Sequence, residues 1–142
     1  MRIAFGTDER TAVTDAVEAW LAEHGHDVVV VAPRGGPWPD VGAAVGNAVA
    51  SGEADRGVVC CWTGTGVSIA ANKVPGVRAA LCTDRGTAEG ARRWNDANVL
   101  AFGLRLTTEA VAVELLDGFL ATDVDPDERA LIQHVEAPPN AS

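Results

Sequence analysis

The chain has 142 residues, of which 47% are hydrophobic and 22% charged, and its formal net charge is −9 at pH 7. These values predict a globular chain with a sizeable core and exclude a disordered one. The negative charge argues against nucleic acid or an anionic membrane as the main partner, but a small phosphorylated ligand stays compatible with it. Three cysteines without metal-type spacing, no signal-peptide pattern and no membrane-length apolar run predict a reduced, cytoplasmic protein.

Short β-branched runs alternate with longer helical patterns along the chain. Strands are expected at 2–6, 27–32, 57–61, 77–82 and 98–102. A first helix is expected to run to about residue 24, with Asp8 or Thr11 as its cap. Further helices are expected at 40–51, from the glycine-rich loop to 73, at about 87–94 and at 107–120. This order predicts a three-layer α/β/α sandwich with a five-stranded parallel, Rossmann-like sheet. The domain is expected to span 1–122. Segment 123–142, acidic and then proline-rich, is expected to be a tail that packs on a partner subunit and is disordered towards its end.

A glycine-rich turn joins the third predicted strand to the helix that follows it. Its sequence over 61–73 is Cys-Trp-Thr-Gly-Thr-Gly-Val-Ser-Ile-Ala-Ala-Asn-Lys. Such a turn offers backbone N–H groups and the positive end of a helix dipole to an anion or a developing oxyanion. It is neither a Walker A motif nor a GxGxxG dinucleotide fingerprint. The alternative is a tight turn whose glycines serve steric needs alone, and Trp62 is an unusually large side chain for this loop.

Together with four other segments, this turn resembles the ribose-5-phosphate isomerase B / galactose-6-phosphate isomerase family. The other matching segments lie at 3–8, 51–57, 76–82 and 95–103, with Arg105 behind the last of them. The resemblance covers about residues 1–121 with hardly any gaps. It implies aldose–ketose isomerisation of a sugar or sugar phosphate through a cis-enediolate, without metal or cofactor, in a homodimer or homotetramer whose site lies at the subunit interface.

The resemblance also assigns roles to residues. It places the base on Cys61, a hydroxyl-bearing helper on Thr63 and the oxyanion-binding amides on 62–66. A thiol near a helix N-terminus is suited to this role, because the helix end favours the thiolate; the alternative is a buried thiol at the end of a strand. Substrate contacts are expected at Asp8, Trp38, Trp62, Gly64, Thr65, Gly66, Ser68, Trp94, Asn95, Arg105 and Arg129.

Several of these positions depart from the family's pattern. Glu9 replaces a histidine that helps to bind phosphate, and Trp94 replaces the histidine proposed to open the sugar ring. Indole cannot exchange a proton near neutral pH. Val67 stands where some members have a glutamate, and the basic C-terminal segment retains at most Arg129. We therefore expect a substrate other than ribose 5-phosphate; whether Glu9 acts as a general acid or base is left open.

Tryptophan is concentrated at the expected site. Three of the four tryptophans, Trp38, Trp62 and Trp94, fall on positions that line the family's pocket. They offer broad faces for stacking on a sugar or an aromatic ligand. The alternative is that Trp38 and Trp94 pack in a dimer interface. The alternative function is a catalytically altered or non-catalytic family member that binds a small carbohydrate-like or aromatic ligand.

Three arginines outside this site are expected to have structural or solvent-exposed positions. Arg92 and Arg93 are expected on an exposed helix face, with an anion site as the alternative. Arg78, on the predicted strand 77–82, is expected to be a structural ion-pair partner.

Overall fold

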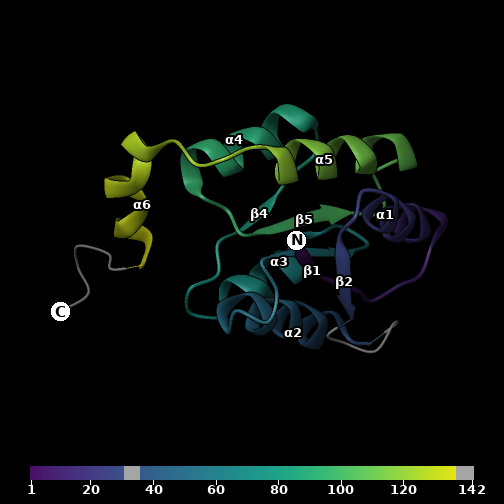
Figure 1. Ribbon diagram of the computed structural model, residues 1–142. Helices are drawn as coiled ribbons and strands as arrows, with labels where there is room; N and C mark the ends of the chain where they lie inside the picture. Colours follow the sequence, from purple (N-terminus) through teal and green to yellow (C-terminus); the bar gives the residue numbers. More distant parts are fainter. Residues whose placement is uncertain (31–35, 137–142) are drawn as a thin grey trace.

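In the computed structural model, which describes residues 1–30 and 36–136, five parallel strands form one sheet between two layers of helices (Figure 1). The strand order is β2-β1-β3-β5-β4. The strands are β1 (Arg2–Thr7), β2 (Asp27–Val30), β3 (Arg56–Cys61), β4 (Ala79–Leu81) and β5 (Val99–Gly103). The predicted α/β/α sandwich is therefore confirmed.

Helices cover both faces of the sheet. They are α1 (Ala12–Glu23), α2 (Trp38–Ala50), α3 (Thr65–Asn72), α4 (Arg85–Asn95), α5 (Glu109–Ala121), a 3₁₀ turn η1 (Pro126–Glu128) and α6 (Arg129–Glu136). Figure 1 shows α2 and α3 on one face and α1, α4 and α5 on the other, with α6 set apart from both layers. None of the helices in the described part of the chain is long and apolar enough to cross a membrane.

Each face of the sheet has its own apolar cluster, because neighbouring residues of a strand point to opposite faces. Cys60 belongs to the cluster beneath α1, α4 and α5, which also contains Phe102 and Phe119. Cys61 belongs to the cluster beneath α2 and α3, which also contains Val45. The two adjacent cysteines therefore lie in different environments.

Element boundaries differ from the predictions in a few places. Helix α2 begins at Trp38, two residues earlier than expected, because its first turn tolerates proline where N–H groups have no helical partner. Strand β4 is shorter than predicted, at three residues. Of the two proposed caps for α1, Thr11 is the one that accepts hydrogen bonds from the first turn. Residues 31 and 32 of the predicted second strand lie outside the described residues.

The segment after α5 is not purely irregular. It forms η1 and α6, and Arg78 holds the end of α6 through an ion pair with Glu136 at 2.5 Å. Arg78 also pairs with Asp96 at 3.3 Å, which confirms its expected structural role. That the tail packs on a partner subunit stays a prediction.

Candidate active site

The glycine loop lies at the carboxyl end of β3, in the middle of the sheet. The N–H of Leu104 donates to the carbonyl of Cys61 at 2.9 Å, and the N–H of Arg105 donates to the carbonyl of Trp62 at 2.9 Å. These bonds continue the β3–β5 pairing beyond the two strands. They hold Arg105 beside the start of the loop.

Two glycines allow the loop to pack against the end of β5. Gly64 has φ 79°, and a Cβ built on it would lie 2.6 Å from the carbonyl carbon of Phe102. A Cβ on Gly103 would lie 2.6 Å from the carbonyl oxygen of Thr63. Backbone atoms therefore leave no room for a side chain at either position.

The same loop leaves a helix N-terminus open. Gly64 is the N-cap of α3, and no side chain within the described ranges caps this helix. The N–H groups of Thr65, Gly66 and Val67 have no hydrogen-bond acceptor in the part of the chain described by the structure. Unpaired N–H groups at the positive end of a helix dipole are suited to holding negative charge.

Cys61 is the cysteine placed at this loop. Cys61 is 5% exposed, and its side chain lies on the α2–α3 face of the sheet. Burial raises the pKa of Cys60 and of Cys82 to about 12 each, so both thiols stay protonated at neutral pH. The location of Cys61 and the protonation of the other two thiols make it the candidate nucleophile or base.

Asp8 follows β1, the strand next to β3, and lies near the same edge of the sheet. Its Oδ1 atom is buried and accepts no hydrogen bond from the residues that the structure describes. Burial raises the pKa of Asp8, against a lowering by a backbone hydrogen bond. A buried oxygen without a donor is unfavourable unless a ligand supplies one, and a sugar hydroxyl is such a donor.

We expect Asp8→Asn to weaken catalysis without weakening the fold. Because the pKa of Asp8 is raised in the folded state, the free energy of unfolding falls as pH rises through its titration, and an uncharged amide removes this effect. The variant should unfold at the same or a higher denaturant concentration at pH 7. Its kcat/KM should fall by roughly tenfold or more, since a hydrogen bond from substrate to a charged group is lost. A variant that is both less stable and fully active would contradict this assignment.

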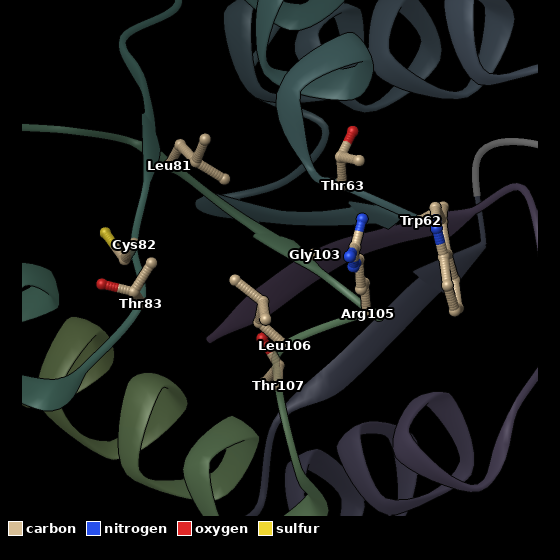
Figure 2. A pocket seen from close by; sticks show the side chains of 9 residues that line it. All are labelled: Trp62, Thr63, Leu81, Cys82, Thr83, Gly103, Arg105, Leu106 and Thr107. Carbon is tan, nitrogen blue, oxygen red and sulfur yellow. The ribbon is translucent and has the colours of Figure 1, made fainter.

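A cavity of about 410 Å³ opens beside the loop, at the carboxyl ends of β3, β5 and β4 (Figure 2). This volume is in the range that holds small-molecule ligands. Arg105 lies on its wall, is exposed, and has no ion-pair partner in the described part of the chain. The lining residues are Trp62, Thr63, Leu81, Cys82, Thr83, Gly103, Arg105, Leu106 and Thr107.

Six of these lining residues were not assigned a role from the sequence. Leu81 ends β4 and is followed by Cys82 and Thr83, while Gly103 ends β5 and is followed, after two intervening residues, by Leu106 and Thr107. Their common signal is position at the end of a parallel strand or just after it, where ligands of such sheets bind. That signal locates a loop but does not say which of its side chains turn toward the cavity.

Further predicted residues gather around the α3 N-terminus. The hydroxyl oxygens of Thr63 and Thr65 are 2.8 Å apart. The ring of Trp38 packs on Gly66, where a Cβ would lie 2.8 Å from ring atom Cε3. Ser68 is in the first turn, and its N–H donates to the carbonyl of Gly64 at 3.2 Å. Trp38 therefore borders the loop while 45% of it stays exposed.

Four of the predicted site residues do not join the residues around the α3 N-terminus within one chain. The ring of Trp94 packs on Gly90, and Trp94 and Asn95 border a separate hollow along β4. Arg129 lies near the amino ends of the strands instead of the glycine loop. Glu9 follows Asp8 and is exposed. The three tryptophans thus do not form one cluster in a single chain, because α4 carries Trp94 away from the loop.

Comparison with known proteins decides the family. The family model described as Ribose/Galactose Isomerase matches residues 3–135. The chain belongs to the ribose/galactose isomerase family. Ribose-5-phosphate isomerase B of Escherichia coli (strain K12) is 37% identical over 144 residues, covering 96% of this chain and 93% of the relative.

A solved structure and a relative named for a different substrate extend this comparison. The chain superposes on ribose-5-phosphate isomerase B of Clostridium thermocellum with a TM-score of 0.91 and 36% identity, covering 96% of each chain. The 4-deoxy-4-sulfo-D-erythrose isomerase of Clostridium sp. (strain MSTE9) is 31% identical over 127 residues, covering 86% of this chain and 80% of the relative. The predicted enzyme class is confirmed: the chain is a sugar-phosphate isomerase of this family.

Across 1–30 and 36–136, no three histidine, cysteine, aspartate or glutamate side chains are gathered as a metal ion requires. The groups available for chemistry at the loop are the Cys61 thiol, the Asp8 carboxylate, the threonine hydroxyls, the Arg105 guanidinium and the backbone N–H groups of α3.

Proposed function

We propose that this enzyme interconverts an aldose and a ketose by proton transfer through Cys61, on a sugar phosphate other than ribose 5-phosphate. The observation that supports the proposal is that Cys61 ends β3 and the loop after it leads directly to the N-terminus of α3, which no side chain within the described ranges caps. A base and an oxyanion-binding group are thus at one end of one strand.

In the proposed reaction the Cys61 thiolate takes a proton from the carbon next to the substrate carbonyl. The carbonyl oxygen becomes negative, and the N–H groups at the start of α3 stabilise it more in the transition state than in the ground state. The thiol then returns the proton to the neighbouring carbon, while Thr63 and Asp8 hold substrate hydroxyls. The hydroxyl proton passes from the neighbouring oxygen to the former carbonyl oxygen. The former carbonyl carbon is thereby reduced and its neighbour oxidised, so no external oxidant or reductant is needed, and the enediolate is the single intermediate.

Side-chain chemistry supports an open-chain substrate. Trp94 has replaced the residue that the family resemblance associates with ring opening, and indole cannot move that proton. Glu9 adds a negative charge near the place of substrate phosphate, so Arg105 is left as the cation at the cavity. The relatives' names include both ribose 5-phosphate and a four-carbon sulfonated sugar, which supports variation of substrate within the family.

We also propose a homodimer or homotetramer whose site is completed by a second copy. Trp94 is 55% exposed beside Asn95, although both are expected substrate contacts. Apolar side chains on α6 are exposed as well, with Leu131 at 64% and Val135 at 67%.

Free thiols at all three cysteines support a reducing, cytoplasmic location.

A second candidate function is binding without turnover. The favouring observation is the exposure of Trp62 at 56% and Trp38 at 45%, which leaves two aromatic faces free to stack on a ligand. The two candidates differ in whether Cys61 is needed: a binder keeps its affinity without the thiol.

We expect Trp94→His to raise activity on ribose 5-phosphate selectively. An imidazole restores a group that exchanges protons near neutral pH, so kcat/KM for this mostly ring-closed sugar should rise by roughly tenfold or more. Activity on erythrulose 4-phosphate, which has no ring to open, should change little. The measurement is the initial rate on both substrates for wild type and variant.

The matched control is Trp20→His, which changes a tryptophan on α1 that stacks on His24 at 3.9 Å, away from the loop. It should leave the ratio of the two activities unchanged. If wild type already turns over ribose 5-phosphate faster than erythrulose 4-phosphate, the proposed substrate preference is wrong.

A further inference from the structure

A second polar cavity lies at the opposite edge of the sheet from the glycine loop. Its volume is about 580 Å³, and four arginines line it with three aspartates. Arg56 begins β3 and Cys61 ends it, so roughly 17 Å of extended strand separates the two sites. This cavity is therefore separate from the glycine loop of the same chain. Its arginines are Arg56, Arg78, Arg92 and Arg129.

Two of these arginines are set aside, one because it is already paired and one because it is exposed to solvent. Arg78 donates to the carbonyl of Asp96 at 2.8 Å and pairs with the carboxylates of Asp96 and Glu136. Arg129 is exposed at the start of α6. Arg56 and Arg92 remain, and they share the α4–α5 face of the sheet.

Arg92 is only 2% exposed, so its expected place on an exposed helix face is wrong. The helix turns it toward the chain after α4, where Nε donates to the carbonyl of Thr122 at 3.1 Å. Its Nη1 donates to the carbonyl of Ala97 at 2.6 Å and to Asp96 at 2.8 Å. Its Nη2 donates to no group in the part of the chain that the structure describes.

Arg56 is half-buried and has fewer partners. Its Nη1 donates to the carbonyl of Asp55 at 2.8 Å, and no carboxylate of the described residues forms an ion pair with it. Burial and the nearby charge of Arg92 lower the pKa of Arg56. Arg56 and Arg92 thus line one cavity, where Asp96 is paired with Arg92 and no carboxylate of the described residues is paired with Arg56. A half-buried guanidinium without an ion pair is stabilised by a bound anion.

We propose that this cavity binds an oxyanion of the phosphate type, free or carried by a small metabolite, between Arg56 and Arg92. The planar guanidinium presents parallel N–H donors that match two oxygens of a phosphate. The cavity is larger than a phosphate ion, so it also has room for an ester. Asp123 lines the same cavity and opposes an anion, so we expect weak, millimolar binding.

The test is a phosphate titration of the full-length ¹⁵N-labelled protein, followed by amide resonances at constant ionic strength set with chloride. Resonances of Arg56 and Ala97 should shift and saturate. Arg56→Gln should lower the affinity by about tenfold or more, because a charged hydrogen-bond donor is lost. Arg10→Gln removes the same charge from an exposed ion pair with Asp15 and should leave the affinity unchanged.

Asp123→Asn should raise the phosphate affinity several-fold, because it removes the opposing charge. A gain of affinity cannot come from misfolding, so this variant complements the expected loss in Arg56→Gln. A parallel titration with methyl phosphate distinguishes a site for free phosphate from a site for a phosphate ester. Saturation by both probes indicates room for an ester, and saturation by inorganic phosphate alone indicates a site for the free ion. Unsaturated shifts, equal affinity in Arg56→Gln, or shifts confined to residues 63–66 would each overturn the proposal.

Discussion

Cys61→Ala is expected to lower kcat/KM by roughly 10²–10⁴-fold, the range that a general base contributes. Cys61 is the thiol at the uncapped N-terminus of α3, so its removal leaves the oxyanion-binding N–H groups without a base. Substrate should still bind, since these N–H groups and Asp8 are unchanged. The measurement combines steady-state rates with exchange of the substrate's C2 hydrogen in D₂O, which reports proton transfer directly.

The matched control is Cys60→Ala, one residue earlier in the same strand. Its thiol faces the other side of the sheet, and burial raises its pKa to about 12, so it cannot supply a thiolate at neutral pH. Both variants should lose about 1 kcal/mol of unfolding free energy, but only Cys61→Ala should lose activity. Equal activity of the two variants would remove Cys61 as the base and leave the binding function or Glu9 to be tested.

Gly64→Ala should have the largest effect on the fold. The residue needs φ 79°, and the new Cβ would lie 2.6 Å from backbone atoms of Phe102, which cannot move independently. Left-handed strain and overpacking together predict a loss of about 2–4 kcal/mol in the free energy of unfolding. Because Gly64 is also the N-cap of α3, the displaced loop should lose most of its isomerase activity.

Gly25→Ala isolates the two contributions. Gly25 has φ 76°, but no atom lies within 4 Å of its built Cβ, so only the backbone strain applies. Its expected loss is about 1 kcal/mol, with activity retained. Urea unfolding of both variants, with unchanged m-values, measures the difference. If Gly64→Ala is no less stable than Gly25→Ala, the loop does not pack on β5 as described.

Sequence patterns predicted more of the fold than of the site. Alternating strands and helices predicted a parallel sheet, because short β-branched runs and helical spacing are local signals. The shift of α2 to begin at Trp38 was missed, since prolines normally suggest a loop. The buried position of Arg92 was missed as well. Charge alone favours an exposed site, and the carbonyls of Ala97 and Thr122 together with the Asp96 carboxylate reverse that preference.

The sequence alone determined the family, the glycine loop and the identity of Cys61 as the candidate base. It determined them because they reside in contiguous segments whose spacing is visible along the chain. Tertiary structure decided which separated residues meet. It placed Trp38 on Gly66, left Asp8 with an unpaired buried oxygen, and moved Trp94 away from the loop. The physical reason is that these relations depend on the packing of helices on the sheet, which no local pattern records.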